Sequence, residues 1–165
     1  MTGRVTDTDH GAKAMLARLR ALKASTARVR VGVLADAAKD PPKDKNGKVG
    51  KPPKYTLLEV AAVHEFGAPA ANIPQRSFIR APIDAHAEDI KRLQTVLLGH
   101  VVEGKITEAA ALDMLGAKVA SWCQEAITEG IAPPLADATA KRKGSTKPLV
   151  NTGQLKSAIT WKVEG

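Results

Sequence analysis

The chain has 165 residues, which is enough for one ordinary domain and too few for two comfortable ones. Hydrophobic residues make up 44% of it and aromatic residues only 3%, so close helix packing is favoured over a large ring-lined pocket. The single cysteine, Cys123, excludes an intramolecular disulfide and a cysteine-cluster metal site, and it is expected to be a small buried hydrophobe.

The net charge of +8 is unevenly distributed along the chain. Residues 1–30 carry seven basic and two acidic side chains, residues 31–54 six and three, and residues 137–165 six and two, whereas residues 55–136 carry six and ten. Basic ends around an acidic centre suit subunits that pack side by side, or a channel whose basic side faces DNA. A simply solvated surface is the third interpretation.

The first predicted element is an amphipathic helix over about residues 10–25. Its apolar face consists of Met15, Leu16, Leu19 and Leu22. A half-buried strand follows over residues 28–33, in which apolar and polar positions alternate. The valines of this strand are Val29, Val31 and Val33, and its outer face carries Arg28 and Arg30.

Residues 36–54 contain four prolines, two glycines and six lysines, without apolar periodicity. Because paired prolines continue neither a helix nor a central strand, this segment is predicted to be a flexible loop. With a second basic stretch near the end of the chain, it offers cations for a DNA path or for a partner, without sequence-specific recognition. These cations are Lys43, Lys45, Lys48, Lys51, Lys54, Lys141, Arg142 and Lys143.

A second helix is predicted to begin at Tyr55, because Thr56 and Glu59 have the spacing of a capping box. Gly67 is its predicted left-handed stop. The face predicted to be buried has residues four apart: Leu58, Ala62 and Phe66.

Two long helices are predicted next, over about residues 82–103 and 108–129, with Thr107 as the N-cap of the second. Each has an apolar stripe at helical spacing. The stripes are Ile83, Ile90, Leu93, Leu97 and Val101 in the first helix and Leu112, Leu115, Val119, Trp122 and Ala126 in the second. The short turn between the helices contains Gly104 and favours an antiparallel hairpin.

The end of the chain is predicted to form a short helix after Asn151 or Thr152 and a strand over residues 159–163 that pairs with the strand at 28–33. Three aromatic residues are expected at core positions: Phe66, Trp122 and Trp161. We therefore predict one helix-dominated α+β domain over residues 1–165, with a long helical hairpin packed on a small, mostly antiparallel sheet.

The sequence contains no recognisable catalytic motif. His64 and Glu65 begin the zinc-protease pattern H-E-x-x-H, but Ala68 stands where the second histidine is needed. Three neighbouring acids are expected in the first turn of a helix, where they interact favourably with the helix dipole: Asp84, Glu88 and Asp89. Both glycine patterns of nucleotide-binding enzymes are absent, so we expect no enzyme, no cofactor and no metal site.

No membrane partner is expected either. The first residues lack the apolar core of a secretory leader, and the longest apolar runs are far shorter than the ~18–20 residues of a membrane span. We expect a soluble protein of a reducing cytoplasm, or of a particle assembled there.

Two ordered motifs stand out between about residue 57 and the end of the chain. The first is a His-Glu-Phe-Gly element followed by an Ile-Pro-x-Arg-x-Phe-x-Arg element: His64, Glu65, Phe66, Gly67, Ile73, Pro74, Arg76, Phe78 and Arg80. The second is a basic run followed by a Pro-Leu-x-Asn-Thr-Gly-x-Leu element: Thr139 to Gly144, Pro148, Leu149, Asn151, Thr152, Gly153 and Leu155. In this order and spacing, they resemble the small virion morphogenesis proteins of tailed bacteriophages, the neck or tail-completion proteins of the head–tail junction.

The resemblance implies a structural virion protein that assembles as a homo-oligomer, a ring with six subunits, and that catalyses no reaction. Such a ring would lie between head connector or head-closure proteins and tail terminator or tail tube proteins. It would join the tail to the head and leave a bore through which DNA passes. The implied location is the head–tail junction of the virion, with assembly in the bacterial host cytoplasm.

Two questions stay open at the level of the sequence. Arg76 and Arg80 are suited to carboxylates of a neighbouring subunit, such as Glu65 or Glu59, but the same motif residues can equally hold the domain together. A function of a different class, a non-specific DNA-binding accessory protein, is the alternative that the basic ends support.

Overall fold

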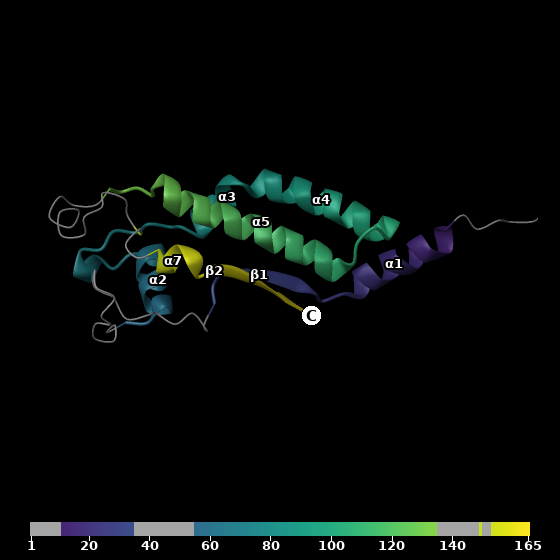
Figure 1. Cartoon of the computed structure of the whole chain (residues 1–165), viewed down its shortest axis with the longest axis horizontal. Helices are drawn as coiled ribbons and strands as arrows, with labels where there is room; N and C mark the ends of the chain where they lie inside the picture. The colour runs from purple at the N-terminus through teal and green to yellow at the C-terminus, as the bar shows by residue number, and fades with distance from the viewer. Residues whose placement is uncertain (1–10, 35–54, 135–148, 150–152) are drawn as a thin grey trace, which may run out of the picture.

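The computed structural model describes residues 11–34, 55–134, 149 and 153–165. It has the predicted α+β architecture, in which helices dominate and a two-stranded antiparallel sheet lies along the helical hairpin (Figure 1). The elements in chain order are α1 (Ala12–Ala24), β1 (Arg28–Val33), α2 (Leu57–Phe66), the 3-10 helix η1 (Pro69–Ala71), α3 (Arg80–Ala85), α4 (Ala87–Glu103), α5 (Glu108–Glu129), α7 (Gln154–Ser157) and β2 (Ile159–Glu164). The predicted loop at 36–54 and the basic stretch at 141–143 lie outside the described residues.

Strands β1 and β2 pair as predicted, in an antiparallel register that sets Val31 opposite Trp161. The apolar side chains of both strands pack against α5. On the opposite face Arg28 and Arg30 both form ion pairs with Glu164, at 3.4 and 3.0 Å. The sheet therefore has the basic outer face that the alternating pattern predicts.

Helices α4 and α5 form the predicted antiparallel hairpin (Figure 1). Thr107 is the N-cap of α5, because its side chain accepts the Ala110 N–H at 3.1 Å. Gly104 ends α4 with a φ of 78°, a left-handed conformation that costs glycine little. Leu97 and Val101 of α4 share a core cluster with buried residues of α5, so the two predicted stripes meet.

The prediction of one helix over residues 82–103 is wrong, because the segment divides at His86 into α3 and α4. The His86 imidazole stacks on the Trp122 indole, with ring centroids 4.3 Å apart, and holds the junction against α5. The same ring bonds Asp89 at 3.0 Å, which lowers the pKa of that carboxyl. Asp84 consequently lies in α3 and not in the first turn of the long helix.

Helix α5 crosses the sheet at close range where Gly116 lies. A Cβ atom on Gly116 would be 2.6 Å from side-chain atoms of both Trp161 and Val29, so the crossing requires a residue without a side chain. Trp161 also donates its indole N–H to Asp113 of α5 at 2.8 Å. These contacts fix the sheet on the hairpin.

The described residues form two core clusters. One joins α2, the start of α3, α5, α7 and β2, and consists of Leu57, Ala61, Phe78, Ala120, Cys123, Ile127, Leu149, Leu155 and Ile159. The other lies within the hairpin and consists of Leu97, Val101, Ala111, Leu115 and Val119.

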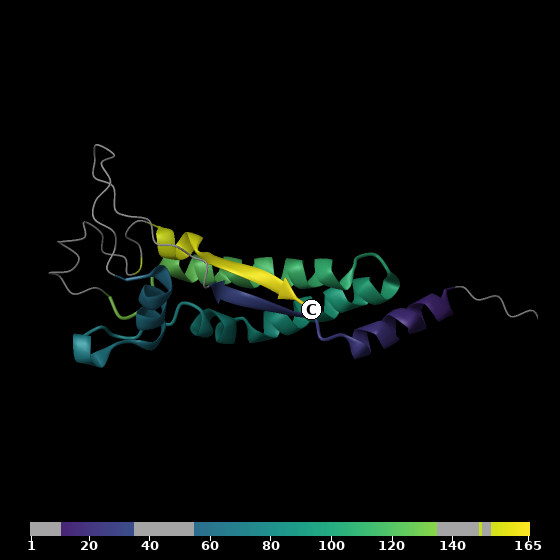
Figure 2. The same cartoon turned by 90° about the horizontal axis from the view of Figure 1, so that it is seen from below.

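Both views of the molecule place α1 at one end of its long axis and α2 with α7 at the other (Figures 1 and 2).

Candidate functional site

The first motif begins where α2 ends, at Phe66, and the chain then turns back through a closed loop. Gly67 ends α2 as predicted, but its φ of 78° and ψ of 166° are not the left-handed helical conformation that was expected. A Cβ atom there would be 2.9 Å from the Gln75 backbone nitrogen. Ala68 and Ile73 close the loop with two backbone hydrogen bonds of 2.8 and 3.0 Å. The loop therefore returns the chain to the end of α2.

The Glu65 carboxylate is the centre of this motif. It is only 8% exposed, and it accepts four hydrogen bonds from the segment that leads into α3. The Ser77 hydroxyl donates at 2.6 Å, and the backbone N–H groups of Phe78, Ile79 and Arg80 donate at 2.8, 3.0 and 3.1 Å. A carboxylate with four donors is well compensated for its burial.

These bonds make Glu65 the N-terminal cap of a helix to which it does not belong. The first N–H groups of a helix have no partner inside it, and the residue before α3, Ile79, has no capping side chain. Glu65 supplies the missing acceptors from α2, while Ser77 accepts the Ala81 N–H at 3.0 Å. The motif is therefore a fixed joint between α2 and α3.

Arg76 joins a third segment to this motif. Its side chain is 5% exposed, and burial lowers the pKa of its guanidinium. Its Nε and Nη2 donate to the carbonyls of Pro133 and Pro134, at 2.8 and 3.0 Å, and its backbone N–H donates to the His64 carbonyl at 2.7 Å. The chain beyond α5 is thus held beside α2.

Arg76 and Glu65 already have partners inside one chain, and their suggested contacts between subunits stay a prediction. Arg76 takes backbone carbonyls, and Glu65 takes backbone and hydroxyl donors. Arg80 differs: its backbone is held by Glu65, but its side chain is exposed. The bonds of Glu65 and Arg76 hold separate segments of the chain together, which agrees with the alternative that the motif is structural.

The second motif packs directly against the first. Leu155 of α7 is buried in the same cluster as Leu57 of α2 and Phe78, and Phe78 is fully buried. Gly153 precedes α7 with a φ of 75°, whereas Thr152 lies outside the described residues. The structure therefore places the described residues of the second motif, Leu149 and Leu155, in the same cluster as Phe78 of the first.

The predicted buried face of α2 is wrong by one residue. The inner face consists of Leu57, Ala61 and Glu65. The predicted face is exposed instead: Leu58 is 43% and Phe66 73% exposed. Of the three aromatic residues expected in the core, Phe66 is therefore outside it, while Trp122 and Trp161 pack against the clusters as predicted.

An apolar groove runs along this outer face of α2, between it and the end of β1. It has a volume of about 370 Å³ and is lined mainly by Val33, Leu58, Ala62, Phe66 and Ile79. Glu65 and Arg80 also line it. Two further residues of the first motif do not line it: Ile73, which is half-buried, and Pro74, which is exposed.

Helix α1 is the second apolar surface. None of its residues is buried, and Met15, Leu16 and Leu19 are 47%, 51% and 40% exposed. Only Leu22 of its predicted apolar face packs against a core cluster. Arg18 attaches the helix to the hairpin by donating to the Val102 carbonyl at 3.2 Å.

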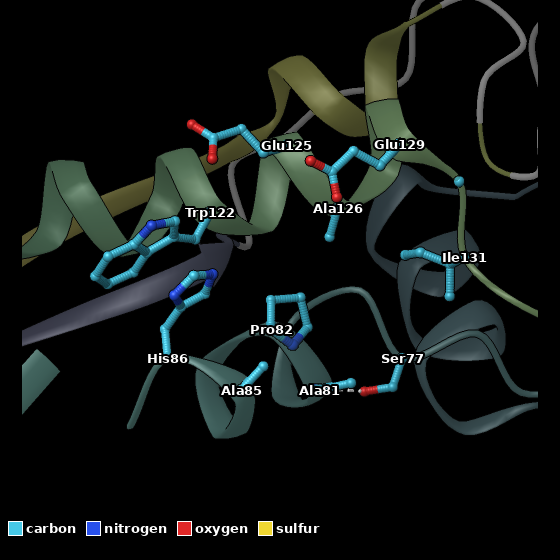
Figure 3. Close-up of a pocket in the computed structure, with 11 residues that line it drawn as sticks. Ser77, Ala81, Pro82, Ala85, His86, Trp122, Glu125, Ala126, Glu129 and Ile131 are labelled. Carbon is cyan, nitrogen blue, oxygen red and sulfur yellow. Dashed lines mark hydrogen bonds between the residues drawn. The ribbon is translucent and has the colours of Figure 1, made fainter. Parts of the chain in front are cut away.

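A further pocket, of about 330 Å³, opens between α3 and the last turns of α5 (Figure 3). Pro82 forms part of its apolar wall, and the stacked rings of His86 and Trp122 close one side. Glu125 and Glu129 stand one helical turn apart on α5. Carboxylates beside an apolar wall suit a cationic side chain of a partner.

Three of these features were not predicted: the capping role of Glu65, the proline carbonyls that accept Arg76, and the exposure of Phe66. Only the capping role of Glu65 has a signal in the sequence from which it could have been predicted. Ser77 is a typical residue for a helix start, and the nearest acid on its N-terminal side is Glu65. The other two depend on how α2 and the end of α5 pack, which no local pattern specifies.

The part of the chain that the structure describes thus defines a helix-dominated α+β protein with a rigid joint and two exposed apolar surfaces. Comparison with family models, with curated proteins and with solved structures finds no match to this chain. Within the described ranges, no helix combines the length and hydropathy that crossing a bilayer requires. No three His, Cys, Asp or Glu side chains among those residues are grouped so that they could hold a metal ion.

Proposed function

We propose that this chain is a structural protein of the head–tail junction of a tailed bacteriophage, a neck or tail-completion subunit. In this proposal, copies of the chain form a ring of six subunits, as the resemblance implies, that joins the tail to the head connector. The ring leaves a bore through which DNA passes, and the chain works by binding and not by catalysis.

One observation carries the assembly role: the exposed apolar side chains of α1 and of the outer face of α2. Phe66 is 73% exposed and Leu16 51%, and neither belongs to a core cluster. Exposed apolar surface of this kind marks a site where another protein binds. The particular assembly is proposed from the two motifs, and Leu155 of the second motif lies in the same core cluster as Phe78 of the first.

The location is tested with phage particles that lack the chain. Mass spectrometry of purified wild-type virions is expected to detect the chain. Cells infected with phage that lacks the chain are expected to accumulate separate heads and tails. Supplying the chain from a plasmid should restore joined particles. Heads and tails that join normally without it would reject the proposal.

A second candidate, a non-specific DNA-binding accessory protein, is favoured by the outer face of the sheet. Arg28 and Arg30 are 64% and 58% exposed there, beside the exposed Lys162. Glu164 pairs with both arginines and reduces their net charge. This candidate predicts that the free monomer binds duplex DNA with a steep salt dependence and that finished particles lack the chain.

A further inference from the structure

We propose that helix α1 of one copy docks in the groove between α2 and β1 of a second copy, so that copies of the chain associate through two different surfaces. The inference rests on the self-association in the proposed function and names the two surfaces that make the contact. Each surface is apolar and exposed in the single chain.

The groove needs an occupant because α2 is apolar on both sides. Its inner face packs into the core through Leu57 and Ala61, while Leu58, Ala62 and Phe66 line the groove outside. A helix that is apolar all round is normally buried all round. The exposure of Phe66 in the single chain therefore marks an interface.

Helix α1 has the matching shape. It presents Met15, Leu16 and Leu19 on a convex surface, whereas the groove is concave. A helix of 13 residues is only marginally stable in water without packing, and α1 contacts the rest of the chain mainly through α4. A partner that covers its apolar stripe would stabilise it.

Charge favours α1 as the occupant. Helix α1 carries four basic residues and no acid, namely Lys13, Arg18, Arg20 and Lys23. Helix α2 carries two acids and neither lysine nor arginine. Glu59 is exposed, and its bonds to Thr56 lower the pKa of its carboxyl, so it is ionised at neutral pH. Arg80 lines the groove and is a cation that the basic side chains of α1 must avoid.

The contact must join two copies. Helices α1 and α2 lie at opposite ends of the molecule (Figures 1 and 2), so α1 cannot enter the groove of its own chain. Pairing of α1 with α1 would bring eight cations of like sign together, which the contact with α2 avoids. A contact between two different surfaces repeats from copy to copy and closes into a ring or continues as a filament.

The single contact is small. Helix α1 is about 20 Å long, and a helix of that length covers less than the roughly 800 Å² per partner of a standard interface. Each copy within a closed ring makes two such contacts, one through α1 and one through the groove. Association is therefore expected to be weak between pairs and to strengthen on ring closure.

The test uses two double variants of the full chain at exposed helical positions. The α1 variant is Leu16→Gln with Leu19→Gln, and the groove variant is Leu58→Gln with Phe66→Gln. Glutamine is a good helix former, so both variants should retain the wild-type circular dichroism. The control variant, Val96→Gln with Leu98→Gln, changes two apolar residues of α4 that are 53% and 50% exposed.

Analytical ultracentrifugation gives a distinct result if α1 of one copy docks in the groove of another. Wild type and control should associate, each variant alone should stay monomeric, and an equimolar mixture of the two variants should form a 1:1 dimer and nothing larger. That dimer arises because the intact α1 of one variant fits the intact groove of the other. Mixing the two variants thus restores one contact between α1 and the groove, and the dimer has no second intact pair of surfaces with which to grow.

Four results would overturn the docking. They are a wild type that stays monomeric at its highest soluble concentration, an α1 variant that dimerises alone, a groove variant that dimerises alone, and a mixture that stays monomeric while wild type associates. Both variants should also fail to join heads to tails in phage complementation. If they join them normally while the virion still contains the chain, the docking is rejected and the proposed function stands.

Discussion

The Glu65 carboxylate accepts the backbone N–H of Phe78 at 2.8 Å, although the two residues lie 13 positions apart. The bond ties the last turn of α2 to the entrance of α3, and it places the Phe78 ring in the core, where it is fully buried. The spacing of the motif follows from this bond. The intervening loop, closed by Ala68 and Ile73, has the length needed to return the chain to Glu65.

Replacing this carboxylate tests the joint. Glu65→Gln should lower the free energy of unfolding by about 2–3 kcal/mol, because the amide NH2 group faces donors where an acceptor is needed. Urea unfolding followed by circular dichroism measures the change. Glu88→Gln is the control, since its exposed ion pair with Lys91 contributes less than about 0.5 kcal/mol. Equal effects of the two substitutions would contradict the capping role.

Local signals in the sequence were sufficient for several elements. The capping box of Thr56 and Glu59 and the N-cap at Thr107 satisfy donors within one turn, so neighbouring residues are enough to predict them. The alternation of β1 and β2 likewise predicted which face packs on α5. What these predictions share is that each partner lies within a few residues or repeats in a regular pattern.

The inner face of α2 could not be predicted in this way. Leu57, Ala61 and Glu65 lie four apart, as do Leu58, Ala62 and Phe66, so periodicity alone does not distinguish the two faces. The second set has only apolar members, so it is expected to face the core. The first set contains Glu65, whose carboxylate would normally be exposed to solvent. Glu65 is buried nonetheless because four donors from a distant segment compensate it.

Two phenylalanines of the same motif should respond in opposite ways to substitution. Phe78→Ala should lower the free energy of unfolding by about 3–5 kcal/mol, because it leaves a cavity around a fully buried ring. Phe66→Ala should change it by less than about 0.5 kcal/mol, since that ring is 73% exposed. Urea unfolding at a concentration where the chain is monomeric compares them. A large loss with Phe66→Ala would place that ring in the core of the single chain.

The close crossing of α5 and the sheet gives a matched pair of glycine substitutions. Gly116→Ala should destabilise the chain by about 1–3 kcal/mol, because its Cβ would collide with Trp161 and Val29 and outweigh the better helix propensity of alanine. Gly99→Ala, on α4, should stabilise it by up to about 1 kcal/mol, since nothing lies within 4 Å. Thermal unfolding of both variants distinguishes them. Stabilisation by both would show that the sheet lies farther from α5.

The buried thiol of Cys123 should make stability fall at high pH. Burial, together with the nearby charge of Glu65, raises the pKa of Cys123 from 9.0 to about 11. The thiol is therefore neutral in the folded chain at a pH where it ionises in the unfolded chain. Its contribution is complete below pH 9 and is lost as the pH rises towards 11.

The expected loss between these pH values is about 2 kcal/mol at most, since one unit of pKa corresponds to ~1.4 kcal/mol. Urea unfolding at a series of pH values measures it, and Cys123→Ala is the control. All other side chains are identical in the two proteins, so their effects cancel in the difference between wild type and variant. The difference should shrink steadily as the pH rises from 9 to 11. A constant difference across this range would mean that the thiolate forms as easily in the folded chain as in the unfolded one, which a fully buried Cys123 does not allow.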